Sequence, residues 1–225
     1  MNYTERAEKF EATLSAAAAS SDADHELAGM LSDPALDMHE RSLVAAALGG
    51  TRGPAGSAAV RKTLDTAWEK YPRASKSHRP WERDLICTCI IALARRDGSA
   101  ATDVYVSAAL HENTNVRRYG LYALAAVGDD RAWETIMTQL AEILKRKITP
   151  DGPRSDEAST AAEYLARHSP QGSERAIRLI TLLREQWRNL GDPDLLERWW
   201  PGIAPGGSSA AAIDLPGLHT VQHRW

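Results

Sequence analysis

The sequence predicts an all-α fold, and three observations support this class. Apolar side chains recur at the three- and four-residue spacing of a helix face, whereas the alternating pattern of half-buried strands is nearly absent. Glycine, proline and aspartate interrupt the periodic segments where helices end or begin. The 225 residues are 43% hydrophobic and 25% charged, so the chain can bury a core without disulfides.

Several segments carry an apolar face of helical period. One opens the chain, a second follows the glycine-rich turn at residues 49–56, and a third ends at Gly191 and Pro193. They cover residues 7–17, 60–68 and 173–190. We expect each segment to form a helix that packs this face against a neighbour.

Residues 112–144 contain two apolar stripes joined by a very short turn. The first stripe starts at Val116 and the second at Trp133. Gly128 can end the first helix, and the aspartate after it can cap the second. The pattern predicts an antiparallel pair of helices.

This passage resembles the HEAT-like repeat of the phycobilisome-lyase type, which has a polar start, a Val-Arg pair, an Ala-Leu pair and then Gly-Asp. The residues that carry the resemblance are Asn113, Val116, Arg117, Ala123, Leu124, Gly128, Asp129 and Ala132. The resemblance implies an irregular α-solenoid of helical hairpins. It leaves the function open, because such repeats occur in lyases, glycosylases and adaptors.

A weaker copy of the repeat lies at residues 37–48. Asp37 and Arg41 keep the spacing of Asn113 and Arg117, but Glu40 stands where Val116 would be. The spacing of these and two more degenerate copies is irregular for a repeat period of about 40–47 residues. We expect a solenoid domain over residues 1–200 and an extended tail, rich in glycine, proline and serine, over residues 201–225.

The formal charge of −3 hides a basic middle, because residues 51–150 carry a net charge of +5. One predicted loop there, residues 73–83, combines cations with an aromatic side chain, which is a mixture that binds single-stranded nucleic acid. It can equally be a solvated loop. Its candidate contact residues are Arg73, Lys76, Arg79, Trp81 and Arg83.

Two arginines in the clear repeat and three tryptophans near the C-terminus are further candidates for partner contacts. Arg117 and Arg118 could meet an anionic partner, although in such repeats the arginine often forms an ion pair to the next unit. Trp199 and Trp200 are adjacent, so one is expected to be exposed or covered by the tail, which ends at Trp225.

No motif for catalysis, a cofactor or a metal is recognised. The His-Glu pairs lack a second histidine four residues on, and His219 and His223 lack further ligands. Gly50, Gly53 and Gly56 supply only half of a phosphate-binding loop, so a helix connection is favoured over an anion site. Cys87 and Cys89 point about 200° apart on a helix, which indicates small apolar residues in a reducing compartment.

Three functional hypotheses follow. The leading one is a non-enzymatic, cytoplasmic scaffold that binds a protein or peptide in a groove, without a membrane span. The second is a DNA-binding enzyme that resembles the HEAT-like alkylpurine DNA glycosylases, whose Trp-rich motif and catalytic Asp cannot be placed here. The third is a tail that docks on another protein or plugs the groove of its own chain.

Overall fold

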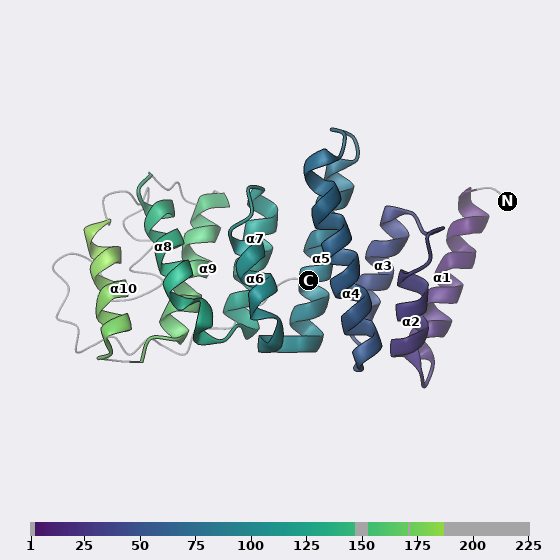
Figure 1. Cartoon of the computed structure of the whole chain (residues 1–225), viewed down its shortest axis with the longest axis horizontal. Coiled ribbons are helices and arrows are strands. Elements are labelled where there is room, and N and C mark those ends of the chain that lie inside the picture. The colour runs from purple at the N-terminus through teal and green to yellow at the C-terminus, as the bar shows by residue number, and fades with distance from the viewer. Residues whose placement is uncertain (1–2, 147–152, 171, 187–225) are drawn as a thin grey trace. The chain divides into compact units, whose positions relative to one another are not determined.

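The computed structural model describes residues 3–146, 153–170 and 172–186, and within them every regular element is helical (Figure 1). The chain divides into two compact units with a boundary between Ala101 and Thr102. The first contains α1 (Tyr3–Ala19), α2 (Ala23–Leu31), α3 (Met38–Leu48), α4 (Pro54–Lys70) and α5 (Arg79–Asp97). The second contains α6 (Thr102–Ala109), α7 (Thr114–Val127), α8 (Trp133–Leu144), α9 (Pro153–Arg167) and α10 (Glu174–Glu185). The predicted all-α class is confirmed.

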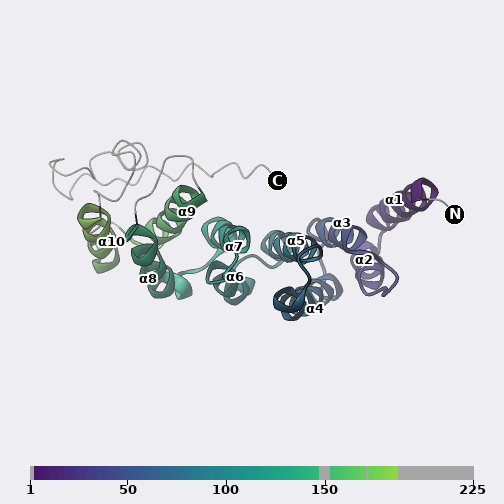
Figure 2. The ribbon, with the colours of Figure 1, turned by 90° about the horizontal axis from the view of Figure 1, so that it is seen from above.

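The helices of the first unit pack in two layers. Figure 2 shows α2 and α4 in one layer and α3 and α5 in the other, with α1 beside α2. Along the chain, α2 pairs with α3 and α4 pairs with α5, while α3 and α5 share the largest contact between successive pairs. Val44, Val60, Leu64 and Ile90 contribute to the buried core between these helices.

The second unit has the same pairing, which differs from the pairing predicted for residues 112–144. Both predicted helices are present as α7 and α8, but α7 packs mainly against α6 and α9, while α8 packs mainly against α9. The two predicted helices therefore belong to different packed pairs: α7 pairs with α6, and α8 pairs with α9. The apolar face of α7 includes Gly120, and this small residue lets α6 approach more closely than α8 does.

Gly120 permits this close contact of α6 with α7. A Cβ atom added there would lie 2.7 Å from the carbonyl carbon of Ala108 and would also collide with the backbone nitrogen of Ala109. Backbone atoms cannot move aside without shifting the whole helix. Gly120 is therefore required by packing rather than by its backbone angles.

Glu40, which breaks the repeat pattern, is accommodated by an ion pair. Its carboxylate accepts hydrogen bonds from Arg6 of α1 at 3.1 and 2.7 Å and from the backbone nitrogen of Asp37 at 2.9 Å. Asp37 in turn caps α3 by accepting from the Glu40 nitrogen at 2.8 Å. The acidic side chain thus links α1 to the start of α3, whereas Val116 in the second unit packs in the core.

A buried polar cluster centred on Arg96 joins four helix ends in the first unit. The Arg96 side chain is 1% exposed and lies 2.7 Å from Asp24 of α2. It also donates to the carbonyl of Gly53 and to the hydroxyl of Thr51, at 2.6 and 2.8 Å. Burial disfavours the charge of Asp24, but hydrogen bonds from Gly56, Arg96 and Thr51 outweigh it and lower the pKa of that carboxyl group.

The same cluster explains the glycine-rich turn. The backbone nitrogen of Gly56, in the first turn of α4, donates to Asp24 at 2.9 Å. The start of α4, where an external anion could bind, is therefore occupied by the Asp24 carboxylate of the chain itself. A side chain at Gly53 or Gly56 would displace Asp24, since each glycine lies against that carboxylate.

In the part of the chain that the structure describes, no helix is long and apolar enough to cross a membrane.

The contact at Gly120 predicts that Gly120→Ala destabilises the fold by about 2–3 kcal/mol, because a methyl group would be forced against backbone atoms. Gly29→Ala is the matched control, since Gly29 is also helical but has open space around its Cβ position. This control should stabilise the chain by about 0.5–1 kcal/mol. Urea-induced unfolding followed by circular dichroism measures both, and an equal effect of the two substitutions would contradict the packing explanation.

The polar cluster predicts that Arg96→Met costs about 3–5 kcal/mol of unfolding free energy, because it leaves Asp24 buried without its charged partner. Lys145→Met is the comparison: Lys145 pairs with Glu142, and both side chains are more than half exposed. We expect little change from that variant. Thermal melts of both variants at neutral pH measure the difference, and an Arg96→Met protein as stable as Lys145→Met would refute the role of the cluster.

Candidate functional site

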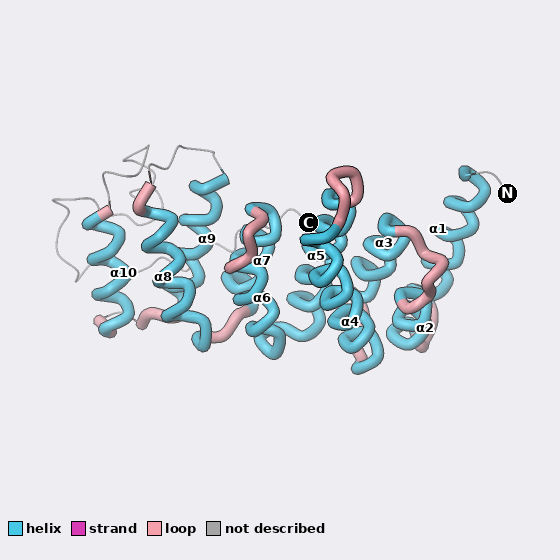
Figure 3. Tube along the Cα trace, turned by 45° about the horizontal axis from the view of Figure 1, so that its top comes forward, coloured by secondary structure: helices cyan, strands magenta, loops and turns pink. Residues whose placement is uncertain are grey.

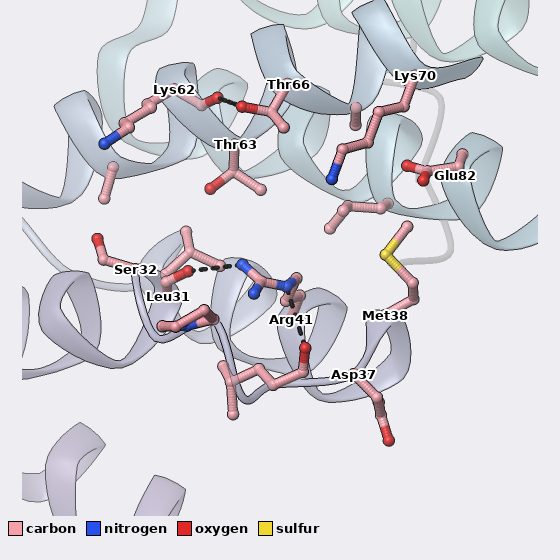
Figure 4. Close-up of a pocket in the computed structure, with 15 residues that line it drawn as sticks. Leu31, Ser32, Asp37, Met38, Arg41, Lys62, Thr63, Thr66, Lys70 and Glu82 are labelled. Atoms are coloured by element: carbon pink, nitrogen blue, oxygen red, sulfur yellow. Dashed lines mark hydrogen bonds between the residues drawn. The ribbon is translucent and has the colours of Figure 1, made fainter. Parts of the chain in front are cut away.

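A pocket of about 540 Å³ lies in the first unit, between the α2–α3 connection and the side of α4. The connection, residues 32–37, is a loop in Figure 3. Figure 4 shows the polar side chains that surround the pocket, with Lys62 and Lys70 on the α4 side and Glu82 beside Lys70. This is the candidate site.

The α4 wall carries a stripe of lysine and threonine. Lys62, Thr66 and Lys70 are separated by four residues each, which places them on one side of the helix, while Val60 and Leu64 are turned into the core. The Thr66 hydroxyl donates to the Lys62 carbonyl at 2.8 Å. Neither lysine donates a hydrogen bond or makes an ion pair to any residue that the structure describes. Both ammonium groups are thus left for solvent or a ligand.

Arg41 shapes the opposite wall. Its guanidinium donates to three carbonyls of the α2–α3 connection and the end of α2: Leu31 and Leu36 at 3.2 Å each and Asp33 at 2.7 Å. These bonds satisfy N–H donors of Arg41, but all three acceptors are neutral carbonyls, so the positive charge of the guanidinium is not neutralised. Across the described residues Arg41 makes no ion pair, so its charge acts on the pocket.

Glu82 forms the inner end of the pocket. Glu82 is only 9% exposed, and its Oε2 atom is buried without a hydrogen-bond partner among the described residues. Burial raises the pKa of Glu82, and the positive charges of Lys70, His78 and Arg41 only partly offset this effect. Because Oε2 is buried, a donor that enters the pocket would reach the other carboxylate oxygen, Oε1.

The candidate residues of the predicted loop 73–83 lie outside the pocket, and the loop is shorter than predicted. Pro80 suits the first turn of a helix, and α5 accordingly begins at Arg79, so only residues 74–78 are outside a helix. This connection extends beyond the end of α3 in Figure 1. Arg73 ends the 3₁₀ helix Tyr71–Arg73, and Lys76 lies exposed on the connection.

The three candidates on the first turns of α5 have separate surroundings. Trp81 is 51% exposed. Arg79 lies over the ring of Tyr71, 5.8 Å from its centre, and Arg83 forms an ion pair with Asp84 at 2.7 Å. The helix brings none of the three to the pocket, because Glu82 between Trp81 and Arg83 is the residue that faces inward.

Glu82 was not among the site residues predicted from the sequence, although the sequence contains a signal for it. Glu82 precedes Leu85 and Ile86 by three and four residues, so it shares the buried face of α5. A carboxylate on an otherwise apolar helix face is unusual and marks a position of interest. Lys62 and Lys70 gave no comparable signal, since exposed helical lysines are common.

Arg117 and Arg118 make the ion pairs expected of structural arginines. Arg117 lies 3.1 Å from Glu157 of α9, and Arg118 forms an ion pair with Asp156. Arg117 also donates to the His111 and Glu112 carbonyls at 3.0 and 2.7 Å. Both arginines therefore fasten α7 to the next pair of helices.

Trp199, Trp200 and Trp225, the predicted tail, and His219 and His223 lie outside the described residues. The described residues contain no group of three or more His, Cys, Asp or Glu side chains arranged to hold a metal ion. Cys87 and Cys89 are buried in α5, and burial raises the pKa of Cys87 to about 12 and that of Cys89 still further.

No protein-family model matches the chain, and comparison with curated proteins and with solved structures found no match either. The chemistry of the pocket is therefore the basis for a functional proposal.

The raised pKa of Glu82 predicts that Glu82→Gln stabilises the chain at neutral pH, by about 1–3 °C in melting temperature. Deprotonating Glu82 costs stability as the pH rises from the ordinary glutamate pKa through the raised value, and glutamine avoids that cost. Below the ordinary pKa both side chains are neutral, so the two proteins should melt together. Melting curves over this pH range test the point, and a neutral-pH melting temperature lower than that of the wild type would contradict it.

Proposed function

We propose that this chain is a non-enzymatic binding module built from HEAT-like helical hairpins, and that its pocket between the α2–α3 connection and α4 holds a segment of a partner protein. The observation that carries the proposal is the α4 stripe of Lys62, Thr66 and Lys70. The two ammonium groups offer hydrogen-bond donors that no described residue uses, and Thr66 lies between them along one open wall.

A local arrangement that occurs in both units supports the repeat assignment. Asp37 and Asn113 each cap a helix, and the arginine four residues later, Arg41 or Arg117, donates to carbonyls of the preceding loop. Each unit also stacks its helical pairs in two layers (Figure 2). Stacked hairpins of this kind commonly present extended binding surfaces.

The dimensions of the α4 stripe suit a peptide segment. Eight residues of helix separate Lys62 from Lys70, which corresponds to about 12 Å along the axis. About four residues of extended chain cover the same length. The Thr66 hydroxyl between the lysines donates to the Lys62 carbonyl, so its oxygen can accept from an N–H group of a peptide backbone.

Site-specific photo-crosslinking in the cells that make this protein tests the proposal. A benzoylphenylalanine at Thr66 should capture a partner protein, because this position lines the pocket. Matched control positions exist at Thr138 and Thr181, which are exposed threonines on α8 and α10. All three hydroxyls donate to the carbonyl four residues earlier, at 2.8, 3.0 and 2.8 Å.

We expect a discrete protein adduct at Thr66 and at least about a fivefold weaker signal at the two controls. Equal adducts at all three positions, or none at Thr66, would count against the proposal. A nucleic-acid adduct at Thr66 would instead favour the glycosylase-like alternative.

A further inference from the structure

We propose that the bound segment is acidic: two of its carboxylates pair with Lys62 and Lys70, and one of its backbone N–H groups donates to the carboxylate of Glu82. This inference rests on the proposed function and specifies the chemistry of the partner. It follows from three features of the pocket: its charges, their spacing and the unsatisfied carboxylate.

The charges that act on the pocket are predominantly positive. Arg41, Lys62 and Lys70 have no carboxylate within ion-pair distance among the described residues. Of the two acidic groups, Asp37 is partly neutralised, because it caps α3 and its carboxylate lies 3.9 Å from Arg6. Glu82 lies at the inner end of the pocket and is only 9% exposed. An anionic segment therefore fits the open face, since it would relieve repulsion among three cations.

The spacing of the lysines limits how such a segment can lie. In an extended chain, residues four apart are on the same side and about 13 Å from one another, which matches the separation of Lys62 and Lys70. Acidic side chains at positions i and i+4 can therefore reach both ammonium groups together. The apolar side chains of Met38 and Leu36 on the facing wall can contact the stems of the intervening residues.

Glu82 distinguishes a peptide from a simple anion. Its carboxylate lines the pocket and accepts no hydrogen bond from a described residue; because Oε2 is buried, the ligand would donate to the other oxygen, Oε1. A cationic donor from the ligand would be repelled by Lys70 and Arg41, whose positive charges already act on the Glu82 carboxylate. A neutral N–H group is the donor that fits, and every peptide residue except proline carries one. Burial raises the pKa of Glu82, consistent with a carboxylate that gains from such a bond.

A displayed library of random peptides about 12 residues long, selected on the full chain, tests this proposal. We expect enrichment of peptides with two acidic residues four apart. Their affinity should fall about tenfold or more for the double variant Lys62→Gln, Lys70→Gln. The control Lys76→Gln, Lys145→Gln removes the same charge from exposed positions that do not line the pocket, and should change affinity less than about twofold.

Two substitutions at Glu82 test the contact with the backbone. Glu82→Gln retains an acceptor oxygen and should bind the selected peptides nearly as well as the wild type. Glu82→Met removes the acceptor while keeping a buried side chain of similar size, and should weaken binding by about tenfold. Equal binding by these two variants would overturn the role given to Glu82.

The failure of this inference differs from the failure of the proposed function. Selected peptides that crosslink at position 66 but lack acidic residues, or that bind the lysine double variant as tightly as the wild type, would overturn the acidic ligand alone. Selection of no peptide that crosslinks at position 66 would contradict the binding pocket itself.

Discussion

The buried ion pair between Asp24 and Arg96 organises the first unit. It lies where α2 and α4 begin and where α3 and α5 end, and it satisfies backbone groups of Gly53 and Gly56 as well. A buried pair of this kind stabilises a fold only when its remaining donors and acceptors are used, and here the neighbouring turn uses them. The hydrogen bond from the Gly56 nitrogen ties the start of α4, the helix that forms one wall of the pocket, to this pair.

The pocket combines this rigid support with polar groups that the fold leaves unsatisfied. Within α4, one side is buried and the other carries unpaired lysines. Glu82 adds a carboxylate in surroundings that disfavour its charge. Proteins commonly accept such local destabilisation at binding sites, because a ligand can satisfy the groups concerned. The unpaired charges and the buried carboxylate lie within one pocket, which is the main structural reason to regard it as functional.

The second unit shows how the same chain satisfies comparable groups internally. Arg117 and Arg118 pair with carboxylates on α9, and the buried indole of Trp133 donates to the Ser169 hydroxyl at 2.9 Å. Arg178 lies over the Trp133 ring while pairing with Glu134. Cations and aromatic side chains are therefore used to join helices there, which contrasts with the free lysines of α4.

The sequence by itself determined the helical class, most helix positions and several helix caps, because these depend on local periodicity and on side chains close in sequence. The sequence also indicated that Arg117 could form an ion pair to the next unit, and that Asp37 and Arg41 keep the spacing of Asn113 and Arg117. It could not determine that α7 pairs with α6, since that depends on how closely two backbones approach at Gly120. Nor could it bring Lys62, Arg41 and Glu82 together, because they come from three helices. Only tertiary packing decides which polar groups find partners and which remain for a ligand.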